Sequence, residues 1–236
     1  MKDLAGYLSS RRYPGRGILF GVTLDENYAA AVYFIMGRSA NSRNRVFVET
    51  EDGILARAYD DALVTDPSLI LYTPIRHHKN SLIVSNGDQT DTIYSFLSNG
   101  GSFHSALLTR AYEPDAPHYT PRISGLLHMN RNSASYMLSI LRKEPATMDC
   151  ARDIYEYAQP PAGTGHLIHT YEEGGDPLKT FSGEPVAVML PEGPAEHFTD
   201  VLWNSLDEEN RISLCVLFMP LSGGEPFTIL RNAHIR

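Results

Sequence analysis

The amino-acid sequence predicts an α+β protein in which antiparallel sheets are covered by helices. Apolar, β-prone runs arrive in pairs joined by short turn clusters, as in hairpins. Helical periodicity is confined to the middle of the chain and to one segment near its end. Alternating βαβ units would place a helix after each strand, so the pattern favours antiparallel sheets over a parallel one.

The strands are predicted from apolar runs bounded by turn residues. Asp25-Glu26-Asn27 and Asp52-Gly53 each separate two such runs, and their residue types tolerate the positive φ of hairpin turns. The chain therefore begins with two hairpins. In order, the predicted strands are 18–24, 28–36, 46–49, 54–59, 69–72, 82–84, 123–128, 135–141, 186–190, 214–219 and 227–230.

Three helices are predicted from apolar residues that recur at three- and four-residue steps. The first spans 88–97 and the second 102–110, with Asp88 and Ser102 as their expected N-caps. The third, 194–206, is amphipathic. Because the predicted helices are grouped in the middle and near the end of the chain, we expect them to pack on the outer faces of the sheets.

Composition limits the class of protein. The chain has 236 residues, is 42% hydrophobic and 20% charged, and carries 20 Lys and Arg against 28 Asp and Glu. The net charge of −8 argues against general binding to nucleic acid or to an anionic membrane, but a small anionic substrate is allowed where arginines converge. Neither a signal peptide nor a membrane span is recognisable, so a cytoplasmic protein is expected.

Cysteine and histidine give no metal-binding pattern. The two cysteines are far apart and are expected to be buried or inert thiols. No histidine pair has zinc-ligand spacing with a third ligand, so no metal site is predicted. The residues considered were Cys150, Cys215, His77, His78, His166 and His169.

The first candidate site is an arginine-rich turn at 37–45, directly after an apolar strand. Arg38, Arg43 and Arg45 lie among short polar residues such as Ser39. One guanidinium group can donate two hydrogen bonds to a pair of phosphate oxygens, and small residues let the backbone approach the phosphate closely. The segment therefore predicts an anion site. A solvated loop whose arginines pair with acidic residues is the alternative.

The second candidate is the segment 84–93, where a strand, an Asn86-Gly87 turn and a helix start follow one another. Amides at a helix start can bind an anion. The same pattern occurs in many folds without a ligand, so taken alone it favours a structural role.

The third candidate is a proline-punctuated connection at 110–122 that contains two carboxylates, two tyrosines and two arginines. Glu113 and Arg122 belong to it. Such groups serve as acids, bases or proton donors when an arginine lies beside them. Capping and surface salt bridges also explain these residues, and the pattern alone favours that explanation.

These segments together resemble the archaeal-type IMP cyclohydrolase family. The resemblance implies one domain over residues 1–236 with a four-layer αββα sandwich of antiparallel sheets, similar to Ntn hydrolases. It also implies ring closure of 5-formamidoimidazole-4-carboxamide ribotide (FAICAR) to IMP with loss of water, a purine ribotide as the small-molecule partner, and no cofactor. The resemblance rests on 13–16, 38–45, 84–87, 90–93, 112–115, 120–123 and 170–172.

The resemblance also assigns residues. The catalytic arginine falls on Arg45, the catalytic tyrosine on Tyr72 and the catalytic glutamate on Glu113. Ring closure requires a carboxamide nitrogen to attack a formyl carbonyl. Glu113 is expected to remove the amide proton, Tyr72 to donate to the formyl oxygen, and Arg45 to stabilise developing negative charge or to favour ionisation of the tyrosine. Substrate contacts are expected from Arg16, Arg38, Ser39, Arg43, Asn86 and Arg122.

Some features depart from the family pattern. The stretch between Arg38 and Arg45 is longer than the corresponding turn of the family, so Arg43 is an alternative to Arg45 as the arginine that reaches the site. Lys2 leaves no nucleophile after the initiator, which disfavours an amide hydrolase of the Ntn type. Extra material at 151–165 and at the C-terminus is expected to reshape the pocket. A purine-ribotide-binding protein that is non-catalytic or differently reactive remains the alternative function, and the oligomeric state stays open.

Overall fold

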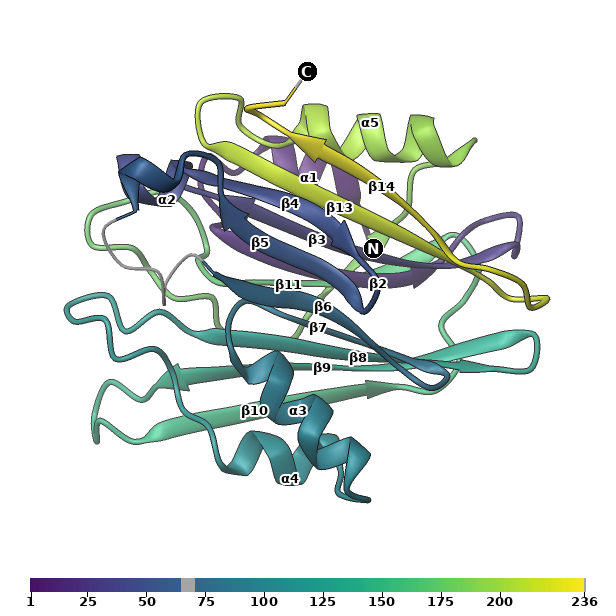
Figure 1. The fold of residues 1–236 in the computed structure, drawn as a ribbon, viewed down its shortest axis with the longest axis horizontal. Coiled ribbons are helices and arrows are strands. Elements are labelled where there is room, and N and C mark those ends of the chain that lie inside the picture. Colours follow the sequence, from purple (N-terminus) through teal and green to yellow (C-terminus); the bar gives the residue numbers. More distant parts are fainter. Residues whose placement is uncertain (65–70, 236) are drawn as a thin grey trace.

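Two seven-stranded sheets, A and B, stack face to face in the computed structural model, which describes residues 1–64 and 71–235 (Figure 1). Sheet A has the order β1 (Lys2–Asp3), β12 (Val186–Met189), β11 (Thr164–His169), β2 (Arg16–Val22), β3 (Tyr28–Met36), β13 (Arg211–Pro220) and β14 (Phe227–Asn232). Sheet B has the order β10 (Cys150–Tyr157), β9 (Ser133–Lys143), β8 (Arg122–Asn130), β7 (Ser81–Ser85), β6 (Tyr72–His78), β5 (Gly53–Ala58) and β4 (Arg45–Thr50). The described strands pair antiparallel apart from β1 and β12, which are parallel.

Helices cover the outer face of each sheet (Figure 1). Those described are α1 (Leu4–Ser9), α2 (Ala40–Arg43), the 3₁₀ turn η1 (Asp61–Leu63), α3 (Gln89–Ser98), α4 (Phe103–Leu108) and α5 (Ala195–Ser205). Helices α1 and α5 lie on sheet A, and α3 and α4 lie on sheet B. The class is therefore α+β, with two mostly antiparallel sheets.

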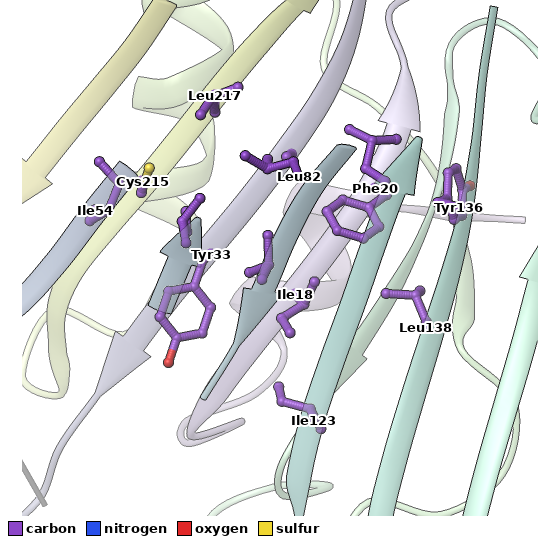
Figure 2. Close-up of a cluster of buried hydrophobic side chains, with 14 of the residues drawn as sticks. Ile18, Phe20, Tyr33, Ile54, Leu82, Ile123, Tyr136, Leu138, Cys215 and Leu217 are labelled. Carbon is purple, nitrogen blue, oxygen red and sulfur yellow. The ribbon is translucent and has the colours of Figure 1, made fainter. Parts of the chain in front are cut away.

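The central core fills the space between the sheets. Ile18 and Phe20 of β2 face Ile123 of β8 and Leu138 of β9, as Figure 2 shows, and these side chains are fully buried. Leu19, between Ile18 and Phe20, points to the opposite face and packs under α1 and α5. Because both faces of β2 are covered, its sequence is a continuous apolar run instead of an alternating one.

Sheet B is buried in the same way. Ile83 and Leu126 face α3 and α4, where Ile93 and Phe103 meet them. The order of layers is helices, sheet A, sheet B, helices, and burial of these apolar faces is the main favourable term in folding.

Most predicted strands are present, and 28–36 is confirmed at both ends as β3. Residues 69 and 70 of the predicted strand 69–72 lie outside the described part, and Leu71 is not in a strand. Strand β6 begins at Tyr72 and continues to His78. Pro74 lies in β6 where the pairing with β5 is interrupted, so no ladder hydrogen bond is lost there.

The segment 151–165, expected as added material, is part of both sheets. Strand β10 forms one edge of sheet B, and β11 pairs with β2 and β12 inside sheet A. Strand β10 was missed because its charged residues, Arg152, Asp153 and Glu156, are typical of a half-exposed edge. Helix α1 was missed because it has only six residues.

The two predicted helix caps, Ser102 and Asp88, differ in how they meet the helix start. Ser102 caps α4, since its hydroxyl accepts from the Ser105 amide in a capping box. Asp88 occupies the N-cap position of α3 as predicted, but its side chain makes no cap hydrogen bond. Its carboxylate accepts instead from Arg110 and Arg122, whose guanidinium groups are stronger donors than an amide.

Both cysteines are free thiols, with Cys215 fully buried in the central core and Cys150 half-buried. Among the described residues, no helix has the length and apolar character needed to cross a membrane.

Candidate active site

The site is built where β2, β4 and β6 begin and where the chain enters β8. Arg16 is the first residue of β2, Arg45 of β4 and Tyr72 of β6. Glu113 lies in the connection between α4 and β8. Sheet A therefore supplies Arg16, and sheet B and its connection supply the three residues predicted to be catalytic.

Arg16 and Glu113 form the charge pair of this site. The distance from Arg16 Nη1 to Glu113 Oε1 is 3.4 Å, and the two side chains are only 19% and 12% exposed. Burial disfavours the charged arginine, but nearby Glu113 and the phenols of Tyr72, Tyr33 and Tyr171 outweigh it and raise the pKa of Arg16. The guanidinium is therefore a permanent cation next to the carboxylate.

Gly15 brings Arg16 into position. Its φ is +80°, and a Cβ there would lie 2.3 Å from Thr170 Oγ1 and 2.7 Å from the Tyr171 ring. Both the backbone conformation and the close contact require glycine. Thr170 then fixes the next residue, because its hydroxyl oxygen lies 3.1 Å from the Arg16 amide, which donates to it.

The backbone around Glu113 is held by a small hydrogen-bonded loop. The Glu113 amide donates to the Thr120 carbonyl over 2.9 Å, and Asp115 accepts from the Thr120 amide over 2.7 Å. The Thr120 hydroxyl also lies 2.8 Å from the Tyr171 hydroxyl. Asp115 thus stabilises the loop through Thr120, and its negative charge helps to raise the pKa of Glu113.

Burial raises the pKa of Glu113, while the cations of Arg16, Arg122 and Arg45 act in the opposite direction. A carboxylate with a raised pKa is a stronger base than one in water. The raised pKa therefore makes Glu113 a better proton acceptor than an ordinary glutamate.

Arg45 points inward from the arginine-rich turn. It is 2% exposed, Nε donates to the Ser42 carbonyl over 2.7 Å, and Nη2 donates to the Met36 carbonyl over 3.4 Å. Burial lowers the pKa of Arg45, and the neighbouring cation Arg16 adds to this effect. These bonds hold the guanidinium in one orientation.

Tyr72 is 8% exposed, and its hydroxyl lies 2.8 Å from the hydroxyl of Tyr33 on β3. Arg16 connects the predicted residues, since it contacts Glu113 and interacts electrostatically with Tyr72 and Arg45. The three residues predicted to be catalytic therefore lie near the Arg16 guanidinium. Tyr33 cannot be recognised from the sequence, because it is one of many apolar residues in its strand. A buried tyrosine hydroxyl needs a hydrogen-bond partner, but the burial of Tyr33 is known only from the structure.

The arginines of the turn at 37–45 lie in two places: Arg45 is in the buried site, and Arg38 and Arg43 line a cavity at the surface. The turn contains the short helix α2, whose N-terminus Ser39 caps with its hydroxyl. Arg38 and Arg43 are exposed, whereas Arg45 is buried. Ser39 is therefore used by the helix cap and lies on the surface.

Arg38 and Arg43 line a cavity of about 670 Å³. Arg38 donates to the Gly175 carbonyl over 2.9 Å, and its guanidinium lies 4.9 Å from the centre of the Tyr13 ring. Tyr13 links this cavity to the buried site, since its hydroxyl donates to the Met36 carbonyl over 3.5 Å, the same acceptor that Arg45 uses. The lining residues are Ser10, Arg12, Tyr13, Arg38, Arg43, Glu173, Gly174, Gly175, Asp176, Glu209 and Asn210.

The Asn86 side chain is bonded to protein groups through its oxygen and through one of its two amide N–H donors. Its side-chain amide donates to the Pro121 carbonyl over 2.9 Å, and its side-chain oxygen accepts from the Ile123 amide and from Gln89. Asn86 is 1% exposed. It joins the Asn86-Gly87 turn to the start of β8, which is a structural role.

Arg122 lies at the border of the site. Nη1 donates to Asp88 over 2.7 Å and to Gln89 over 2.6 Å. A Cβ on Gly87 would lie 2.8 Å from this nitrogen and 3.8 Å from Glu113 Oε1, so the turn backbone, Arg122 and Glu113 are neighbours. Arg122 therefore lies close enough to act on Glu113 while its nitrogen is held by protein acceptors.

The described residues contain no group of three or more His, Cys, Asp or Glu side chains arranged to hold a metal ion. His166 bonds to Tyr136 over 2.8 Å and stacks on Tyr157, and His169 is buried between Tyr7 and Tyr171. These histidines belong to the packing of the sandwich.

Comparison with known proteins identifies the family. The family model described as IMP cyclohydrolase-like protein matches residues 13–223, which include Arg16, Arg45, Tyr72 and Glu113. The IMP cyclohydrolase of Methanopyrus kandleri (strain AV19) is 27% identical over 194 residues, covering 79% of this chain and 90% of that protein. The chain therefore belongs to the family of IMP cyclohydrolase-like proteins.

Proposed function

We propose that this protein is an IMP cyclohydrolase that closes the ring of FAICAR to give IMP and water. The observation that carries the proposal is the largely buried pair of Arg16 and Glu113 at 3.4 Å, with Tyr72 and Arg45 near the same guanidinium, in a chain whose relative is named IMP cyclohydrolase. The reaction joins two groups of one substrate and releases water. Its atoms and electrons balance without an oxidant or a reductant.

The first step is attack of the carboxamide nitrogen on the formyl carbon. A carboxamide is a poor nucleophile, so removal of its proton by Glu113 assists the attack, and the raised pKa of Glu113 makes it a better base. The carbonyl oxygen gains charge as the C–N bond forms. Tyr72 gives that oxygen its proton, and the Arg45 cation stabilises the developing charge.

The second step releases water from the carbinolamine. The hydroxyl group leaves with a proton returned by Glu113, and the nitrogen of the former formamide loses its own proton as the C=N bond forms. Tyr72 regains its proton in this step, so both groups return to their starting state. Acid and base assistance each contribute about 10²- to 10⁴-fold.

The phosphate of the ribotide is assigned to the cavity lined by Arg38 and Arg43. Both guanidinium groups are exposed there, and Tyr13 connects the cavity to the carbonyl that holds Arg45. Arg16 is assigned to Glu113 and the base, since it lies 3.4 Å from that carboxylate. Ser39 and Asn86 support the fold around the substrate, and Arg122 adjusts the charge near Glu113.

The whole chain, residues 1–236, is proposed to act as one domain with a fold similar to that of Ntn hydrolases. The layer order of helices, two sheets and helices supports this assignment. The expected partner is a small purine ribotide and not a nucleic acid, in keeping with the net charge of −8.

The test is turnover of FAICAR by the purified protein, followed by the absorbance change of purine formation and by chromatographic identification of IMP. Tyr72→Phe and Glu113→Gln should each lower kcat about 10²- to 10⁴-fold with KM nearly unchanged. Glu156→Gln, which changes an exposed glutamate on β10, is the matched control. If the parent binds the ribotide in calorimetry but forms no IMP, the alternative of a non-catalytic purine-ribotide-binding protein is correct.

A further inference from the structure

The hydroxyl groups of Tyr33 and Tyr72 form a pair whose surroundings are unequal. Tyr33 is completely buried, whereas Tyr72 is 8% exposed. The Tyr33 ring belongs to the central core (Figure 2) and stacks on Phe47 with ring centres 5.5 Å apart. The two hydroxyl oxygens lie 2.8 Å apart. Packing on all sides of the Tyr33 ring therefore fixes the position of its hydroxyl.

Each phenol carries one proton, and only one of the two can lie between the oxygens. Among the described residues, Tyr72 is the one hydrogen-bonding partner of the Tyr33 hydroxyl. The cations that act on Tyr33, Arg16 and Arg45, are donors and cannot accept its proton. If Tyr72 donated to Tyr33, the Tyr33 proton would be buried without an acceptor among the described residues, which is unfavourable.

In the opposite direction the remaining proton is on Tyr72, the less buried of the two side chains. When Tyr33 donates to Tyr72, the Tyr72 proton turns away from Tyr33 and is available to a substrate oxygen. We propose that Tyr33 is a positioning residue that directs the Tyr72 proton at the substrate oxygen. This inference rests on the proposed function, in which Tyr72 protonates the formyl oxygen.

A fixed proton direction matters for catalysis because a donor aimed in advance needs no reorganisation during the reaction. Without the Tyr33 hydroxyl, the Tyr72 proton is free to rotate among several directions. Loss of the Tyr33 hydroxyl should therefore slow the chemical step and leave substrate binding unchanged, since neither hydroxyl of the pair binds the phosphate.

The kinetic test is Tyr33→Phe, which removes one oxygen and keeps the ring on Phe47. We expect kcat to fall about tenfold or more with KM within about twofold of the parent, as for loss of a group that acts in the transition state. The matched control is Tyr136→Phe, in which an equally buried phenol loses its bond to His166. The control should keep its kcat.

A double mutant separates positioning from general damage. In a Tyr72→Phe background there is no Tyr72 proton to direct, so adding Tyr33→Phe should change kcat by less than about twofold. An equal fall in both backgrounds, or an unchanged kcat in Tyr33→Phe alone, would overturn the inference even though the parent forms IMP.

A neutron diffraction structure of the deuterated parent tests the inference without turnover. The deuteron between the two oxygens should be bonded to Tyr33, and the Tyr72 deuteron should point away from Tyr33. A deuteron bonded to Tyr72 between the oxygens would refute the proposal. Absence of IMP formation by the parent, with the expected deuteron positions, would instead refute only the proposed function.

Discussion

Arg16 reaches from sheet A to Glu113, which lies in the connection that leads into sheet B, and the two side chains meet at 3.4 Å. Both are largely removed from water. Coulombic interactions are weakly screened in such a place. The balance between burial and the Arg16 cation therefore determines at which pH Glu113 becomes a base.

The first prediction concerns the pH dependence of turnover. Burial raises the pKa of Glu113 above its ordinary value of 4.5, so kcat/KM should fall on the acid side as pH drops through that raised pKa. Arg16 lowers the same pKa, so Arg16→Gln should raise it further and move the acid limb to higher pH. Steady-state rates measured from pH 4 to 8 check this.

The control for that profile is Arg231→Gln, since Arg231 pairs with Glu196 and Asp200 on α5. Its acid limb should coincide with that of the parent. An acid limb that stays in place in Arg16→Gln would mean that Glu113 is not the base.

The second prediction concerns Gly15, which places Arg16. Gly15→Ala should destabilise the protein by about 2–5 kcal/mol, because it adds positive-φ strain and overpacking against Thr170 and Tyr171. The activity should fall as well, since Arg16 moves with the backbone. Urea denaturation and kcat measure the two effects.

Gly100 provides a matched control for backbone strain. Its φ is +79°, close to the +80° of Gly15, but a Cβ there meets nothing within 4 Å. Gly100→Ala should therefore cost only the strain, about 1–2 kcal/mol, and leave kcat unchanged. Equal losses in the two variants would show that contact with Thr170 and Tyr171 is unimportant.

The sequence predicts the central strands well because both faces of those strands are buried. The run 28–36 has hardly any polar position and is β3 over its full length. Strand β10 and helix α1 escaped because an edge strand carries charges and a six-residue helix has too few turns for periodicity. The extent of β6 could not be predicted, because Pro74 lies where the pairing with β5 is irregular and a local sequence pattern does not show such an irregularity.

The site was predictable only in part. Motif resemblance pointed to Arg45, Tyr72 and Glu113, but their meeting depends on contacts between segments far apart in the chain. Asn86 and Ser39 have types that suit ligand binding, yet protein groups use their hydrogen bonds. Which polar groups remain available is decided by tertiary contacts, so residue type alone could not separate them.

The third prediction concerns His169, which couples stability to pH. The Tyr171 carbonyl lies 2.7 Å from Nδ1 and can only accept, so Nδ1 carries the proton and Nε2 accepts from the Tyr7 hydroxyl. Burial lowers the pKa of His169 from 6.5 to about 4. Between these values the unfolded chain binds a proton that the folded protein does not, so stability is lost as pH falls through this range.

The size of that loss follows from the pKa difference, since each pKa unit corresponds to about 1.4 kcal/mol. From pH 7 to pH 4 the free energy of unfolding of the parent should fall by about 3 kcal/mol more than that of His169→Gln. His104→Gln, at an exposed position on α4, should follow the parent. Parallel curves for the parent and His169→Gln would contradict the assignment.

The last prediction tests the cavity as the phosphate site. A hydrogen bond to a charged group contributes about 1.5–3 kcal/mol, so Arg38→Gln should raise KM for FAICAR by about 10- to 100-fold with kcat within about twofold. The same variant should have little effect on the dephosphorylated riboside. Arg12→Gln is the matched control, because Arg12 lines the same cavity but bonds to Glu209 over 2.9 Å. A KM effect of equal size on the riboside would show that Arg38 binds another part of the substrate, and the phosphate would then belong to the buried arginines.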